Sequence, residues 1–186
     1  MNNKIILDLC GGTGAWSLPY LEAGYNVINI TLPAYDIMSY SPPQKNVYGI
    51  LASPPCTEFS LAKSTKPRNF KIGMALVKRC LEIIWEVRIN QKLKFWALEN
   101  PRCFTRQFLG KPVFVFEQWE FGDKGIKPTD IWGYFNIPQK TVKQKPNQIS
   151  RTYPCGSRNA VGWSKSAEKR AITPAGFASA FFEANK

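Results

Sequence analysis

IILDLCGGTG, residues 5–14, is the stretch that decides the fold. Its apolar first half predicts a buried strand, the glycines predict a tight turn, and the segment that ends at Gly24 is typical of a helix. Glycine lets the backbone approach a ligand closely, and the first turn of a helix offers free N–H groups. This order indicates the first unit of an α/β sheet, with a nucleotide-like ligand at the turn.

The second informative stretch is YGILASPPCTEFS, residues 48–60, in which a short apolar strand leads into two prolines and Cys56. Pro54 and Pro55 fix their own φ angles and restrict the residue before them, so the thiol is held at the rim of the sheet. The pattern predicts a nucleophile at the end of a strand. Taken alone, it also fits a turn with a buried structural cysteine.

The third stretch is FWALENP, residues 95–101, an apolar strand with Glu99 near its carboxyl end and a proline stop. Alone, Glu99 also fits a solvated acid. In open α/β sheets, ligands bind at the carboxyl ends of the strands. A parallel sheet would therefore bring the glycine turn, Cys56 and Glu99 together at one edge.

These three stretches, in this order, resemble the DNA cytosine-5 methyltransferases, which use S-adenosylmethionine. The resemblance covers most of the chain, because residues 121–133 lie where the family has its glutamine-and-arginine motif and residues 173–184 resemble its closing segment. It implies a Rossmann-like S-adenosylmethionine-dependent methyltransferase fold, mainly parallel with helices on both faces. More narrowly, the chain is similar to the short members found in phages.

The resemblance also implies roles for individual residues. The implied cofactor-binding residues are Asp8, Leu9, Cys10, Gly11, Gly12, Thr13, Gly14, Trp16, Thr31, Asp36, Ile37 and Pro54. Cys56 and Glu99 are the implied catalytic residues. The implied substrate-binding residues are Pro55, Ser60, Asn100, Lys127 and Thr129, to which the basic segment described below adds Lys143, Lys145 and Arg151.

The chain departs from the family at several of these places. The acid that would bind the ribose at the end of the second strand is absent, so Thr31 or Asn29 would have to replace it. The paired arginines near the target base are missing too, and Lys127 and Thr129 are the nearest candidates. These departures leave open a second interpretation, in which the chain is a catalytically degraded relative that binds nucleic acid.

The chemistry of the family explains why a thiol and a carboxyl group are needed. Cytosine C5 is a poor nucleophile, so a thiolate must first add to C6, and Glu99 would bind N3 and the exocyclic amine of the adduct. Since a free cysteine with a pKa near 8.5 is mostly protonated, we expect nearby positive charge or N–H groups to lower the pKa of Cys56. A target in duplex DNA would have to leave the stack.

Composition excludes several other classes of protein. At 186 residues, the chain predicts one methyltransferase domain over 1–186. It has no histidine, which rules out a Cys-His pair and a histidine-bound metal, and its five cysteines form no CxxC pair. We expect no metal, no membrane contact, a monomeric state, and a cytoplasmic location in a bacterial or phage-infected cell, since neither a signal peptide nor a membrane span is visible.

The formal net charge is +12, with 25 Lys and Arg against 13 Asp and Glu, which predicts an anionic partner. Positive charge concentrates between residues 136 and 170, where Glu168 is the one acid and Tyr153 and Trp163 are interleaved. This segment predicts phosphate contacts and a reduced recognition region for DNA. RNA or a free cytosine nucleotide is the alternative substrate, and a charge that serves solubility alone is the alternative interpretation.

Periodicity predicts the remaining elements. Strands are expected near 4–9, 26–30, 47–52, 94–98, 113–119 and 130–135, and helices over 69–90, 102–109 and 175–184. The longest helix has an apolar face of Ile72, Leu76, Leu81, Ile83, Ile84 and Val87. Residues 61–70 predict a mobile loop behind the nucleophile, which could close as a lid.

Overall fold

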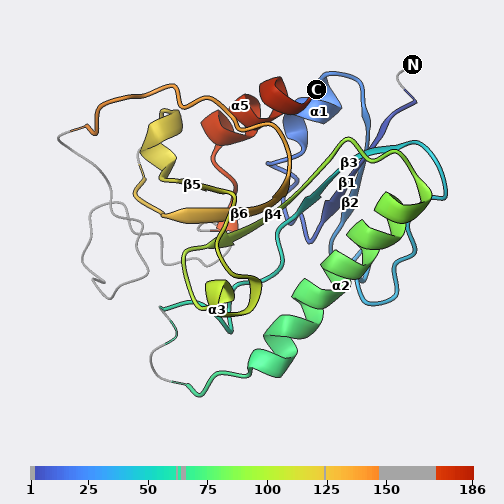
Figure 1. Ribbon diagram of the computed structural model, residues 1–186, viewed down its shortest axis with the longest axis horizontal. Coiled ribbons are helices and arrows are strands. Elements are labelled where there is room, and N and C mark those ends of the chain that lie inside the picture. Colours follow the sequence, from blue (N-terminus) through green and yellow to red (C-terminus); the bar gives the residue numbers. More distant parts are fainter. Residues whose placement is uncertain (1–2, 62, 64–65, 124, 147–170) are drawn as a thin grey trace.

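The computed structural model in Figure 1 describes residues 3–61, 63, 66–123, 125–146 and 171–186. Strands and helices alternate along most of the chain, as expected for an α/β fold. The strands are β1 (Ile5–Leu9), β2 (Asn26–Ile30), β3 (Val47–Ala52), β4 (Phe95–Pro101), β5 (Phe114–Phe116) and β6 (Thr129–Tyr134). The helices are α1 (Leu18–Glu22), α2 (Phe70–Asn90), α3 (Thr105–Leu109), the 3₁₀ helix η1 (Gln118–Phe121) and α5 (Ala175–Asn185).

The six strands form one sheet in the order β2-β1-β3-β4-β6-β5. The first four are mutually parallel, whereas β6 is antiparallel to both of its neighbours, β4 and β5. The carboxyl ends of the four parallel strands therefore lie at one edge, and β6 begins at that same edge, since Pro101 pairs with Thr129. The predicted Rossmann-like α/β fold, with a mainly parallel sheet, is confirmed.

Helices cover both faces of the sheet, as predicted. On one face, α2 packs against alternate strand residues such as Leu7, Ile50 and Leu98. On the other face, α1 and α5 cover residues of the opposite parity, such as Ile6 and Leu51. The alternation follows from the period of two in a strand, so strands covered on both sides are apolar throughout.

Helix α2 is the longest of the described helices. It begins at the predicted position because the Asn69 side chain accepts a hydrogen bond from the Ile72 N–H, 3.1 Å away. Its buried face contains Val77, Cys80, Ile83, Ile84 and Val87. Ile72, expected in that face, is instead 61% exposed. Among the described residues, no helix combines the length and the apolar character needed to cross a membrane.

Two predicted elements have different bounds in the structure. The strand expected over 113–119 ends at Phe116, because Glu117 and Glu120 form a reciprocal capping box that starts η1. The strand expected over 94–98 continues to Pro101, since its last residues pair with β6. This extension places Glu99 and Asn100 within the sheet and delays the next helix until Thr105.

Candidate active site at the carboxyl edge of the sheet

The order of the strands identifies where a ligand should bind. From β1 the chain moves to β2 on one side, and it then returns to β3 on the other side of β1. The sheet thus has a topological switch point between β1 and β3, and ligands of open α/β sheets bind in the crevice at such a point. The glycine turn follows β1 and the Cys56 loop follows β3, so both flank the crevice.

The glycine turn packs tightly over the end of β1. A Cβ atom at Gly11 would lie 2.3 Å from Cγ of Asp8, so only glycine fits beneath this turn. Gly12 has a φ of 56°, in the left-handed region, and a Cβ there would meet no atom within 4 Å. The turn therefore presents bare backbone towards the crevice, which is what close approach of a ligand requires.

Two buried oxygen atoms beside this turn accept no hydrogen bond from the described residues. They are Oδ1 of Asp8 and Oδ1 of Asn29, which lie on the paired strands β1 and β2. The other oxygen of Asp8 accepts a 2.6 Å bond from Ser17, and the Asn29 amide donates to the Gly12 carbonyl. Unpartnered buried acceptors call for a ligand that donates. The ammonium and ribose hydroxyls of S-adenosylmethionine are such donors, so these residues fit that cofactor.

Other predicted cofactor residues differ in their surroundings. Thr31 follows β2 at the same edge, Asp36 is exposed and accepts a bond from the Met38 N–H, and Ile37 is buried. Arg79 of α2 holds this loop through the carbonyls of Ile37 and Tyr40. The described residues thus give a fixed loop beyond β2.

Three residues of the predicted cofactor loop are engaged elsewhere. Trp16 is buried against Phe177 and Phe181 of α5, so it packs in the core instead of lining the crevice. The Leu9 side chain is buried, and its carbonyl accepts a bond from Ser53. The Cys10 thiol hydrogen-bonds with Cys80 of α2, and this bond lowers its pKa. Any ligand contact at Leu9 and Cys10 would therefore use backbone atoms.

The loop after β3 holds Cys56 at the start of a tight turn. The carbonyl of Cys56 accepts hydrogen bonds from the N–H groups of Phe59 and Ser60. Phe59 is fully buried and anchors the turn against α2. Asn100, also fully buried, donates to the Pro54 carbonyl at 3.0 Å, which ties the loop to the end of β4. Asn100 thus ties the loop to the sheet, and its contact with substrate stays a prediction.

Glu99 and Lys127 form an ion pair beside this thiol. Their charged atoms lie 3.9 Å apart, and each side chain is only 15% exposed. Glu99 comes from β4, whereas Lys127 precedes β6, and the two strands pair with each other. Burial raises the pKa of Glu99, Lys127 lowers it, and the Asp130 carboxylate raises it further. The net shift is upward, so this carboxyl group gains a proton more readily than an ordinary glutamate.

The expected lowering of the Cys56 pKa is wrong for the protein without ligands. Burial and the negative charge of Glu99 raise the pKa of the thiol to about 11, and Lys127 opposes them. The partly buried loop excludes the water that would stabilise a thiolate. Burial is the larger of the two causes, and the thiol is therefore held protonated.

Sequence reasoning missed Asp130, a fully buried acid on β6. Arg106 of α3 binds both of its oxygens, and Arg102 lies 3.8 Å from one of them. Arg106 belongs to α3, whereas Arg102 lies in the bend after β4, so no sequence spacing signals their shared partner. The cluster places two guanidinium groups on the acid behind Glu99.

The remaining predicted substrate residues lie around the Cys56 loop. Pro55 is exposed, Ser60 is half-buried, and Thr129 is buried with its hydroxyl on the Lys127 carbonyl. Pro54, predicted to contact the cofactor, is buried beneath the loop.

Described residues of the expected lid are held in place. Glu58 pairs with Lys63 and accepts a bond from the Asn69 N–H, while Arg68 donates to the Ser60 and Lys63 carbonyls. Closure of this loop would have to break these contacts. Its mobility stays a prediction.

The predicted basic segment is described only up to residue 146. In that part, Lys140 pairs with Glu120 and Lys145 with Glu117, both near η1, while Lys143 is exposed. Arg151, Tyr153 and Trp163 lie outside the described residues. Two of the three lysines named here are thus paired with acids of the protein. The contacts of this segment with phosphates stay a prediction.

Comparison with known proteins adds a likeness of fold. No protein-family model matches this chain, and no curated protein matches its sequence. Among solved structures, the chain is similar to the Entamoeba histolytica methyltransferase EhMeth, with a TM-score of 0.41 and 12% identity over 79% of this chain. It is also similar to a mutant of Spodoptera frugiperda DNMT2, with a TM-score of 0.42 and 14% identity over 81% of this chain. The matches span only 57% and 55% of the length of those two chains.

Asp8 should make the stability of the protein depend on pH. Burial raises its pKa from 3.8 to about 6, although the bond from Ser17 opposes the shift. The native state then holds a proton that the unfolded state releases, so the contribution of Asp8 to stability rises as the pH falls from about 7 to about 4. We expect Asp8→Asn to increase the free energy of unfolding at pH 7 by up to about 3 kcal/mol, with little change near pH 4.

Urea unfolding of both proteins, followed by circular dichroism across this pH range, measures the difference. Ser17→Ala is the matched control, because it removes the bond that stabilises the charged form and should lower stability at pH 7. A constant difference between wild type and Asp8→Asn at every pH would contradict the assignment.

Proposed function

We propose that this protein transfers a methyl group from S-adenosylmethionine to C5 of cytosine in DNA, through a covalent adduct of Cys56. One observation supports this above all. A thiol on the loop after β3, a carboxyl group of raised pKa on β4 and a half-buried lysine before β6 meet beside the switch point of the sheet. A nucleophile, a proton donor and a cation are what addition to a pyrimidine ring needs.

The glycine turn and the end of β2 are the proposed cofactor site. When bound, S-adenosylmethionine supplies the electrophilic methyl group. Asp8 and Asn29 would accept hydrogen bonds from its donor groups, since each has a buried oxygen without a donor among the described residues. The unpartnered oxygen favours Asn29 over Thr31 for the place of the missing ribose acid.

In the proposed first step, the Cys56 thiol loses its proton to solvent, the thiolate sulfur bonds to C6 of cytosine, and the electrons of the C5–C6 bond move into the ring. Protonated Glu99, whose pKa is raised by burial, gives its proton to N3 and so balances the charge that the sulfur brings. C5 is then a nucleophile able to take a methyl group. Loss of the C5 proton to a base restores the C5–C6 bond and expels Cys56 as a thiolate, and N3 returns its proton to Glu99.

The ion pair of Glu99 and Lys127 links the protonation of the Glu99 carboxyl group to that of the Cys56 thiol. An ionised Glu99 raises the pKa of Cys56, whereas Lys127 lowers it. A protonated Glu99 removes the first of these charges, so the thiol becomes more acidic when the carboxyl group is in its reactive state. This coupling would keep the nucleophile unreactive until the site is ready for addition.

Incubation with cofactor labelled in its methyl group tests the function. Duplex DNA, single-stranded RNA and dCMP are offered separately, and the product base is identified by mass spectrometry. 5-Methylcytosine in DNA is expected. Label in RNA or dCMP alone would keep the chemistry and change the substrate. No transfer to any of the three, together with DNA binding, would favour the degraded relative.

Lys127→Met should weaken the nucleophile. The substitution keeps the length of the side chain and removes the charge that opposes the raised pKa of Cys56. We expect the pKa of this thiol to rise further. Each increase of the pKa by one should slow alkylation of the thiol by iodoacetamide at pH 8 about tenfold, because the thiolate fraction falls tenfold. Alkylation at Cys56 is followed peptide by peptide, because Cys10, Cys80 and Cys103 are also free. An unchanged rate would show that Lys127 does not act on the thiol.

A further inference from the structure

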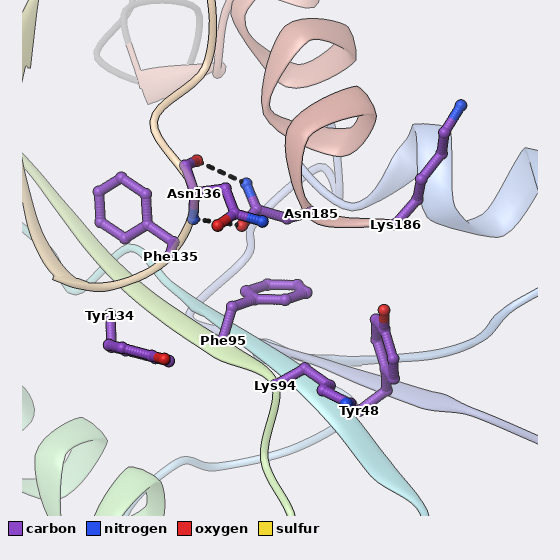
Figure 2. Close-up of a pocket in the computed structure, with 8 residues that line it drawn as sticks. All are labelled: Tyr48, Lys94, Phe95, Tyr134, Phe135, Asn136, Asn185 and Lys186. Atoms are coloured by element: carbon purple, nitrogen blue, oxygen red, sulfur yellow. Dashed lines mark hydrogen bonds between the residues drawn. The ribbon is translucent and has the colours of Figure 1, made fainter.

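A second hollow lies at the opposite edge of the sheet from Cys56. It is a cavity of about 320 Å³ at the amino ends of β3 and β4, where Phe95 lies between Tyr48 and Tyr134 (Figure 2). Phe135, Asn136 and Asn185 form its far side. The two asparagines bond to each other and to main chain, so this wall is fixed. None of these residues belongs to the proposed active site.

Exposed aromatic rings continue this cavity onto α2. The guanidinium of Arg88 lies 5.5 Å from the centre of the Trp85 ring and 5.3 Å from that of the Tyr134 ring. The two aromatic residues are 49% and 61% exposed, so part of each ring is open to solvent beside Arg88. Tyr134 belongs both to this stack and to the cavity. We call the stack and the cavity together the amino-edge surface.

Lysines surround the amino-edge surface. Lys4, Lys45, Lys92 and Lys94 are exposed and precede β1, β3 and β4, which places all of them at this edge. The acids of the described residues near the edge are Glu22, Glu86 and Glu183, and Glu183 already pairs with Lys186. The excess of positive charge agrees with the net charge of +12 for the whole chain. A polyanion with planar groups would complement both the positive charge and the rings of this edge.

We propose that the amino-edge surface binds single-stranded nucleic acid, with bases stacked on Tyr134 and Trp85. Aromatic side chains and arginine planes stack on unpaired bases, and lysines around them bind the phosphates. A duplex fits less well, because its bases are covered by their neighbours in the stack. The surface is independent of the proposed methyl transfer, since it shares no residue with that site.

The test uses the full chain with Cys56→Ser, so that no covalent adduct can form. The probe is a thymidine oligonucleotide of about 12 nucleotides, within the span of one such surface, with 4-thiothymidine at every third position. Irradiation and mass spectrometry then map the crosslinked peptides. Crosslinks to peptides with Trp85, Tyr134 or Tyr48 are expected. Crosslinks confined to the peptides around Cys56 and Glu99, or none at all, would overturn the proposal.

A second measurement gives the affinity. Fluorescence anisotropy of the same oligonucleotide without thio groups yields the dissociation constant of each variant. Tyr134→Leu and Trp85→Leu should each weaken binding by about 5- to 100-fold, because each removes one stacking surface. The matched controls are Ile72→Ala, an apolar residue at the other end of α2 that is 61% exposed, and Lys78→Ala, whose lysine pairs with Glu82 on the same helix.

Both controls should bind as the parent does. Melting curves check that each variant is folded. Because the replaced rings are exposed, we expect the melting temperature to change little. Equal affinity of the Leu variants and the parent would overturn the proposal. Tighter binding of a duplex of the same sequence than of the single strand would overturn it too.

Discussion

Cys56→Ser should abolish methyl transfer while leaving the fold unchanged. The substitution replaces one sulfur with oxygen in a loop that is held by Phe59 and by the bond from Asn100 to Pro54, neither of which it alters. The pKa of Cys56 is already raised to about 11, and a serine hydroxyl is less acidic still, so the nucleophile is lost. We expect the turnover rate to fall by a factor on the order of 10⁴ to 10⁶, as for other enzymes that lose their nucleophile.

A trapping experiment makes this prediction specific. DNA with 5-fluorocytosine at the target should form a covalent complex with the wild type, because fluorine cannot leave C5 as a proton does. The complex should be stable in denaturant, and its crosslinked peptide should contain Cys56. Cys103→Ser is the matched control, since its thiol lies in the same site but bonds to Asn100 and Thr105. Turnover by Cys56→Ser at the wild-type rate would remove this residue from the mechanism.

Glu99→Gln should have the second largest effect, and it should act in two opposite directions. Glutamine cannot donate a proton to N3, so we expect the transfer rate to fall by about 10² to 10⁴. Yet the same substitution removes the negative charge that raises the pKa of Cys56. The thiol pKa should therefore fall, and alkylation of Cys56 at pH 8 should become faster.

This opposition separates a chemical role from a structural one. A variant that merely disturbed the loop would change transfer and alkylation together, whereas loss of the charge slows the first and speeds the second. Lys127→Met removes a positive charge instead of a negative one, so it should slow both methyl transfer and alkylation of Cys56. Slower alkylation in Glu99→Gln would contradict the proposed coupling between the carboxyl group and the thiol.

Local sequence determined most of the elements. The apolar runs that became β1, β2 and β3 are bounded by glycine, proline or asparagine, and such boundaries depend on nearby residues alone. The gathering of the glycine turn, Cys56 and Glu99 at one edge was predictable as well. It follows from the geometry of a parallel sheet, in which the carboxyl ends of all strands meet. The Asn69 cap of α2 is another local signal that the structure confirms.

Only the tertiary structure decided the electrostatics of the site. The sequence predicted a Cys56 thiol of lowered pKa, but burial and the neighbouring Glu99 raise it, because a charge acts through space and not along the chain. The basic segment shows the same principle. Lys140 and Lys145 have no acid near them in sequence, yet the fold places Glu120 and Glu117 beside them. Strand boundaries depend on neighbours in sequence, whereas the pKa of a buried group depends on which distant side chains the fold brings within a few ångströms.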